Sequence, residues 1–166
     1  MSQDVVVGTG FEVSTAHLKA LGVTDPYSSA SLEAYKGGSL SSDERLYFTL
    51  RGSRLLKAVA FDAKSRVAQA GLPVHAAYFV VSGRLLAVDG KKVHRIGPGG
   101  VIGVAEAAAG LPFSKSYVAV EPVEARVIDA ATIASAIKQC PTGLRGLIRN
   151  ITMRTLGITE VPEVLK

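Results

Sequence analysis

The dipeptide Asp89-Gly90 lies between two short runs rich in aliphatic residues, RLLAV (84–88) and KKVHRI (91–96). This feature constrains the fold most, because Asp-Gly between two such runs is the strongest short-range signal for a β-hairpin. A type I′ turn needs positive φ at both central residues, which Asp and Gly tolerate. The sequence therefore predicts antiparallel β-structure around residues 84–96.

Similar short runs recur between residues 54 and 130, separated by turn residues. They are LLKAVAF (55–61), AAYFVV (76–81), SYVAVEP (116–122) and EARVIDA (124–130). An Ala-rich stretch, GVAEAAAG (103–110), predicts one or two turns of helix among them. Short strands at regular spacing with turn signals between them favour a β-barrel or a β-sandwich.

Helices are predicted on both sides of this β-rich region. Before residue 53, three stretches follow a serine and stop at a glycine: AHLKAL, SLEAYK and ERLYFTL. The third start is the clearest, because Ser41 and Glu44 have the spacing of a capping box. After Ala130 two more helices are predicted, TIASAIKQ and a stretch that begins at Pro141. The last helix has a main apolar stripe with two further apolar residues on another side: Leu144, Leu147, Ile148, Ile151 and Thr155, then Met153 and Leu156.

Composition excludes several classes of protein. With 166 residues, 48% of them hydrophobic and 20% charged, the chain is predicted to form one globular domain with a sizeable core. No apolar run approaches the length of a membrane span, and the start of the chain lacks the pattern of a signal peptide. Cys140 is the only cysteine, so no internal disulfide is expected; we interpret it as a buried small hydrophobic residue and expect a cytoplasmic protein.

Catalytic and metal-binding motifs are not found in the sequence. His17, His75 and His94 have no other ligand at metal-binding spacing, and neither a phosphate-binding loop nor a nucleophile elbow occurs. VVVGTGFEV (5–13) resembles a dinucleotide fingerprint, but Val13 replaces its third glycine, so a flexible N-terminal arm is the simpler interpretation. We therefore expect no enzyme, no metal and no cofactor.

The charge balance bears on partners. The net charge is +5, which fits an acidic ligand without requiring one. Residues 130–157 contain four cations and no acid, so this part of the chain is either a solvated helix face or a contact for an acidic partner. Specific DNA binding is not expected, because too few residues follow the last helix to complete a helix-turn-helix.

The segment 97–119, GPGGVIGVAEAAAGLPFSKSYVA, is the most informative for function. A glycine-rich turn leads through a strand end into a short helix, and a proline and polar residues follow. This order brings unpaired helix amides close to hydroxyl and amine groups. Such a combination attracts phosphate.

From about residue 54 to 157 the chain resembles a cyclic nucleotide-binding domain, the family of the regulatory subunits of cyclic-AMP-dependent kinase and of the bacterial catabolite activator. YFVVSGRLLAVDGKKVHRIGPGGVIG is similar to the family's strands and turns before its phosphate-binding cassette, and VEARVIDAATIASAI to its last strand and next helix. The resemblance implies a mainly β fold with flanking helices, a jelly-roll β-barrel. We accordingly expect an N-terminal helical segment (1–53), the barrel with C-terminal helices (54–157) and a tail (158–166).

The cassette itself is similar only in part. The family pattern is Phe-Gly-Glu-(Leu/Ile)-Ala, about five residues, then Pro-Arg-(Ser/Ala)-Ala-Thr. Gly103 and Pro112 match it, and Ser114 and Ser116 stand at the small residue and the threonine. The resemblance thus implies ligand-binding positions at Gly103, Val104, Ala105, Glu106, Phe113, Ser114, Lys115 and Ser116.

Three cassette positions depart from the family pattern. Val104 replaces the glutamate that binds the ribose hydroxyl, and Phe113 replaces the arginine that pairs with the cyclic phosphate. Glu106 stands where the family has a small residue whose amide faces the phosphate, and a carboxylate there would tend to repel an anion.

Two functions follow from these departures. The first is a regulatory or adaptor domain without an output domain, whose pocket is degenerate or takes another small anionic ligand. The alternative is a genuine cyclic AMP or cyclic GMP sensor, in which Lys115 supplies the positive charge and Ser116 binds a phosphate oxygen. In either case we expect a protein partner or a homodimer through the C-terminal helix, with contacts from Met153 and Leu156.

Overall fold

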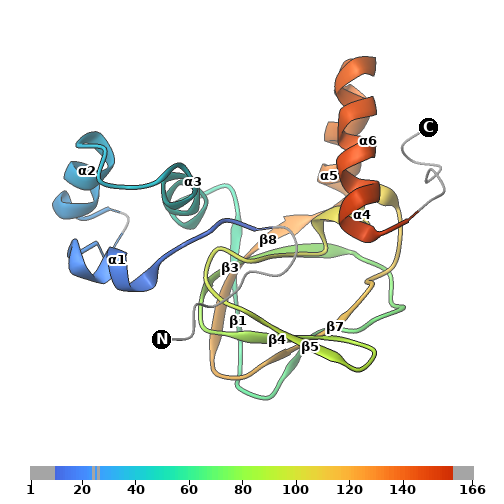
Figure 1. The fold of residues 1–166 in the computed structure, drawn as a ribbon, viewed down its shortest axis with the longest axis horizontal. Helices are drawn as coiled ribbons and strands as arrows, with labels where there is room; N and C mark the ends of the chain where they lie inside the picture. Colours follow the sequence, from blue (N-terminus) through green and yellow to red (C-terminus); the bar gives the residue numbers. More distant parts are fainter. Residues whose placement is uncertain (1–9, 24, 26, 159–166) are drawn as a thin grey trace.

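The computed structural model describes residues 10–23, 25 and 27–158, and their strands form two antiparallel four-stranded sheets (Figure 1). In one sheet the order is β1 (Lys57–Phe61), β8 (Val123–Asp129), β3 (Ala76–Ser82) and β6 (Val101–Ile102). In the other it is β2 (Arg66–Ala68), β7 (Ser116–Ala119), β4 (Leu85–Asp89) and β5 (Lys92–Ile96). The mainly β fold with flanking helices is confirmed. Its jelly roll is a sandwich of two sheets that do not close into a barrel.

The main core lies between the two sheets. Val80 of β3 and Leu85 of β4 are almost fully buried there, together with Ile102 of β6. The alternate residues of β3, Phe79 and Val81, belong to a second core on the outer face of the same sheet. Both faces of β3 are therefore covered, which explains its nearly continuous apolar sequence.

The N-terminal helices form the other side of this second core. They are α1 (Thr15–Ala20), α2 (Ser29–Lys36) and α3 (Ser42–Arg51), and serine N-caps begin all three, as predicted. The capping box of α3 is complete: Ser41 Oγ accepts from Glu44 N at 3.1 Å, and Ser41 N donates to Glu44 Oε2 at 2.9 Å. His17 Nδ1 lies 3.0 Å from Glu44 Oε1, so this cap also ties α1 to α3.

Two groups of hydrogen bonds fasten α3 to the sandwich. The Tyr47 hydroxyl donates to Val81 O at 2.6 Å, and its ring packs at 5.8 Å from that of Phe79. The Arg126 guanidinium on β8 donates twice to Arg51 O, at 2.7 and 3.2 Å. The N-terminal helices are thus packed against the β-sandwich and are not a separate tail.

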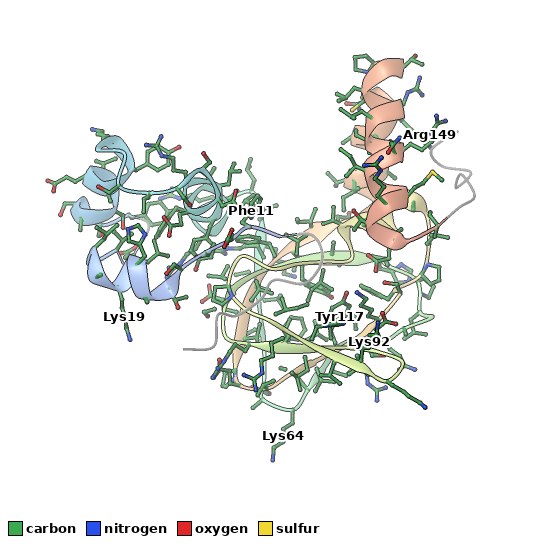
Figure 2. All side chains as sticks on the ribbon, in the orientation of Figure 1. Phe11, Lys19, Lys64, Lys92, Tyr117 and Arg149 are labelled. Carbon is green, nitrogen blue, oxygen red and sulfur yellow. The ribbon has the colours of Figure 1, made fainter. Side chains whose placement is uncertain are left out.

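The start of the described chain differs from expectation. Gly10 forms a β-bridge with Gly100, and Phe11 N donates to Gly99 O at 2.9 Å. The Phe11 ring then packs edge-on against Phe79 at 5.9 Å, between the helices and the sandwich (Figure 2). Gly99 has φ +90°, and a Cβ there would lie 2.6 Å from Phe11 O. The flexible-arm interpretation is therefore wrong for residues 10–13; residues 1–9 lie outside the described part.

The hairpin that the sequence predicted joins β4 to β5. Its turn is shifted by one residue, because Asp89 pairs with Lys92 and leaves Gly90 and Lys91 as the central pair. Gly90 has φ +57°, and Lys91 is not in the positive region. Glycine at the first central position alone is the pattern of a type II′ turn.

Three helices pack together on the other flank of the sandwich. They are α4 (Val104–Ala109), α5 (Ala130–Gln139) and α6 (Thr142–Leu156), and α6 projects away from the sheets (Figure 1). Pro141 is the N-cap of α6 rather than its first residue. Ile148 packs with Ala108 and Ile137 in a small third core. Within the described chain no helix is both long and apolar enough to cross a membrane.

The predicted apolar stripe of α6 does not pack as one surface. Leu144, Leu147 and Ile151 are exposed by 46%, 57% and 55%, whereas Met153 and Leu156 are half-buried. The reason is that α6 turns Ile148 and the buried Thr152 toward its neighbours. Its available apolar face is therefore the one that contains Leu147.

Candidate functional site

The cassette, residues 103–116, connects β6 to β7 and contains α4. Gly103 begins it with φ +81°, a conformation that favours glycine, and a Cβ there would lie 2.8 Å from Phe113 Cε1. Gly110 ends α4 with φ +67°. The two turns bring the Phe113 ring back against Gly103, at the start of the cassette.

Phe113 belongs to the core of the sandwich. It is 7% exposed, and its ring is 6.4 Å from that of Tyr117. Its backbone is held on both sides, because Phe113 N donates to Leu72 O at 3.0 Å and Gly71 N donates to Phe113 O at 2.9 Å. The side chain at this position therefore serves packing and offers no charge to a ligand.

Glu106 is 5% exposed and is bonded within the cassette. Its Oε1 accepts from Ser114 Oγ at 2.6 Å and from Ser114 N at 3.3 Å. Burial raises the pKa of the Tyr117 phenol, and the charges of Glu106 and Asp89 raise it further. Figure 2 shows Tyr117 between the two sheets. A buried carboxylate thus lies beside the sandwich core.

The other predicted ligand-binding residues of the cassette are Ser116, Ala105, Val104 and Lys115. Ser116 Oγ accepts from Ala70 N at 3.0 Å, which ties the end of the cassette to the turn between β2 and β3. Ala105 is buried, and Val104 and Lys115 are half-buried. The first intrahelical bond of α4 runs from Ala107 N to Gly103 O, so the three preceding amides have no partner within the helix.

The structure thus brings Gly103 against Phe113, and Glu106 against Ser114. Sequence reasoning missed the supporting turn at 69–72, which supplies backbone partners to Phe113 and Ser116. No local signal marks that turn as part of the cassette, because the bonds span more than forty positions in the sequence.

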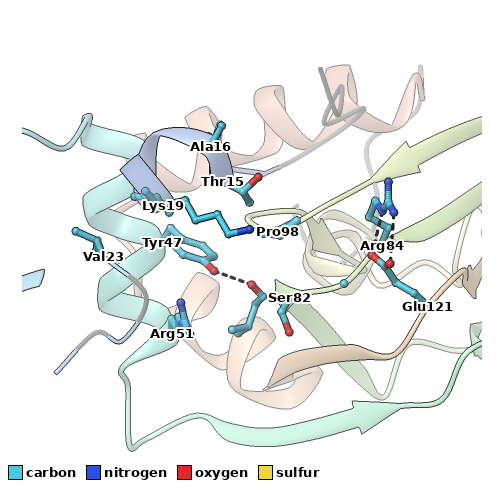
Figure 3. A pocket seen from close by; sticks show the side chains of 13 residues that line it. Thr15, Ala16, Lys19, Val23, Tyr47, Arg51, Ser82, Arg84, Pro98 and Glu121 are labelled. Atoms are coloured by element: carbon cyan, nitrogen blue, oxygen red, sulfur yellow. Dashed lines mark hydrogen bonds and ion pairs between the residues drawn. The ribbon is translucent and has the colours of Figure 1, made fainter. Parts of the chain in front are cut away.

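A cleft of about 600 Å³ lies elsewhere, between the N-terminal helices and the sandwich (Figure 3). Tyr47 and Arg51 of α3 line one side, and Ser82 lines the other. Arg84 and Glu121 close one end with an ion pair at 2.9 Å. None of the residues that line this cleft belongs to the cassette.

The histidines and the cysteine carry side chains that can bind metal ions or act as nucleophiles. In the part of the chain that the structure describes, no three His, Cys, Asp or Glu side chains are grouped to hold a metal. The His17 ring is hydrogen-bonded to the Glu44 carboxylate. Cys140 is half-buried rather than buried, and its Sγ donates to Ala136 O at 3.3 Å.

Solved structures with this fold include proteins bound to cyclic nucleotides. The chain is similar to the EAL enzyme Bd1971 in its cAMP-bound form, with 18% identity and a TM-score of 0.54 over 61% of this chain and 29% of that one. The cGMP-bound form gives 18% identity and 0.55, over 63% and 30%. The chain thus spans less than a third of that enzyme's length. At such identities the likeness establishes the fold alone.

Another similar structure covers more of both chains. It comes from work on a cyclic-GMP-dependent signalling pathway that regulates bacterial phytopathogenesis, with 15% identity and a TM-score of 0.52 over 73% of this chain and 98% of that one. No curated protein matches the sequence. The family model described as "Cyclic nucleotide-binding domain" matches residues 58–140, which is half of the chain and includes the whole cassette. The chain therefore belongs to the cyclic nucleotide-binding domain family.

Proposed function

We propose that this protein is a regulatory or adaptor member of the family, whose cassette is degenerate and does not take cyclic AMP or cyclic GMP. The observation that carries the proposal is the place of Phe113, which occupies the arginine position of the cassette and lies in the sandwich core. A residue that packs there cannot also clamp a phosphate. Val104, at the ribose position, offers no acceptor either.

The expected loss of binding free energy for a cyclic nucleotide supports the proposal. A hydrogen bond to a charged group contributes about 1.5–3 kcal/mol. Loss of the arginine and of the ribose acceptor together removes roughly 3–6 kcal/mol, which is about a hundredfold to ten-thousandfold in affinity. Lys115 recovers little of this, because a lysine is a mobile point charge without the bidentate fork of arginine.

The function that we propose is carried out through a protein contact on α6. Leu144, Leu147 and Ile151 lie three and four residues apart on the exposed side of this helix. A row of this kind is typical of a helix that meets a second copy or a partner. We further propose that the domain has no catalytic activity.

The competing function is a sensor with an altered phosphate site. It has two features in its favour: the first-turn amides of α4, and the half-buried Lys115 on the adjacent loop. If these groups suffice, cyclic nucleotides bind without the arginine.

Isothermal titration calorimetry separates the two. Cyclic AMP and cyclic GMP are titrated into the wild-type protein, into V104E/E106A/F113R, and into V104E/E106A as a matched control without the guanidinium. We expect no binding by the wild type and the control, and binding by the triple variant if thermal melts show that it folds. Micromolar binding by the wild type would refute the proposal and establish the sensor. Unchanged cyclic nucleotides after long incubation would support the absence of catalysis.

A further inference from the structure

The buried Glu106 carboxylate faces the cassette rather than solvent. Its Oε1 takes both donors of Ser114, the hydroxyl at 2.6 Å and the backbone amide at 3.3 Å. Two converging donors on one oxygen are the arrangement by which a protein binds an anion. At 5% exposure the carboxylate has little access to water, so these bonds make up much of its solvation.

We propose that Glu106 is the internal anion of the cassette: its carboxylate occupies the position that an external carboxylate or phosphate would need, and so excludes anionic ligands. This deepens the proposed function, because it explains why the cassette keeps anion-binding donors and yet leaves none of the Ser114 donors for a ligand. Glu106 is thus a specificity-determining residue.

Electrostatics adds to the exclusion. An anion bound at Ser114 would lie about 4 Å from the carboxylate, where like charges repel with a strength that corresponds to about a thousandfold in affinity at a protein-like dielectric constant. Burial, and then the charges of Glu106 and Asp89, raise the pKa of the nearby Tyr117 phenol, which like any tyrosine is uncharged at neutral pH. Phe113 adds no compensating charge.

The proposal also says what the site would bind once Glu106 is removed. Replacement by alanine deletes a fragment of the size and charge of acetate and leaves the two Ser114 donors in place. Acetate added in solution should therefore fill the space. Acetamide has nearly the same shape without the charge, and is the matched control ligand.

The experiment is a chemical rescue followed by thermal denaturation. We expect E106A to melt below the wild type, and acetate at about 0.1 M to recover several degrees of the difference in a saturable way. Acetamide should recover less, and acetate should not shift the wild type, E106Q or E106A/S114A by the same amount. E106Q is the control that keeps an acceptor for Ser114 without the charge. Equal shifts in all four proteins, or none in a folded E106A, would overturn the proposal.

A second measurement needs no variant. Hydrogen exchange of the wild-type protein, followed by NMR, should place the Ser114 amide among the slowly exchanging ones although its side chain is exposed. Fast exchange of this amide would overturn the proposal even if E106A did not fold. Neither measurement uses a cyclic nucleotide, so the two proposals can fail separately. Failed rescue or fast exchange at Ser114 would overturn the role of Glu106 and leave the proposed function standing on Phe113 and Val104, whereas binding of cyclic AMP by the wild type would defeat both.

Discussion

Replacement of Phe113 by alanine is the perturbation that best separates a core residue from a ligand-facing one. The ring is 7% exposed, contacts Gly103 and lies edge-on to Tyr117 at 6.4 Å. Phe-to-Ala changes in protein cores cost about 3–5 kcal/mol, since a cavity remains where the ring was. The cavity here would lie in the core between the two sheets.

For a chain of this length, 1 kcal/mol corresponds to about 2–4 °C in Tm, so F113A should melt about 6–20 °C below the wild type. The assay is calorimetric or CD-monitored melting, with urea denaturation for the free energy. Leu72→Ala is the matched control, because Leu72 lies on the turn that holds Phe113 and is 52% exposed. It should cost under about 1 kcal/mol. A loss of that small size in F113A would refute the placement of Phe113 in the core.

Further predictions concern the cap, the tyrosines and α6. Ser41→Ala removes the capping box of α3 and should cost on the order of 1 kcal/mol in urea denaturation; no change would contradict the cap. Burial by itself would raise the pKa of Glu44, but hydrogen bonds from the His17 side chain and the Ser41 backbone, with the charge of His17, lower it overall. Stability that depends on Glu44 is therefore present above about pH 4.5 and is lost as the pH falls, so E44Q should flatten the fall in Tm between about pH 5 and 3. Burial raises the pKa of Tyr47 and Tyr117, so alkaline titration at 295 nm should leave two of the five tyrosines protonated until the protein unfolds; ionisation of all five in the folded state would contradict their burial. Leu147→Asp should convert a wild-type dimer to monomer in light scattering, whereas a wild-type protein that is monomeric at high concentration would contradict self-association through α6.

Much of the fold could be predicted because its signals are local. Ser41 and Glu44 lie three residues apart, and Asp89-Gly90 joins two adjacent strands, so each pattern carries its own geometry. The shift of the hairpin turn by one residue could not be predicted from the sequence, because the register of β4 depends on its pairing with β7 as well as with β5. The three-residue strand β2 is too short to leave a pattern.

The family pattern locates the cassette in the sequence, but the pattern does not show how the cassette's side chains contact one another. Glu106 was expected to repel an anion, and the sequence gives no sign that Ser114, eight residues later, donates two bonds to it. The burial of Phe113 depends on the turn at 69–72, which is distant in the sequence. The exposed side of α6 likewise depends on where α4 and α5 lie, so Leu147 was not distinguishable from Ile148.

The most direct test of the claim that the cassette does not bind cyclic nucleotides is a two-dimensional amide NMR titration of the wild-type protein with cyclic AMP and cyclic GMP. With Glu106 bonded to Ser114 and Phe113 in the core, the amide resonances of Gly103, Glu106 and Ser114 should stay in place up to millimolar nucleotide. Saturable shifts of these three resonances at micromolar concentration would contradict a cassette that its own side chains fill.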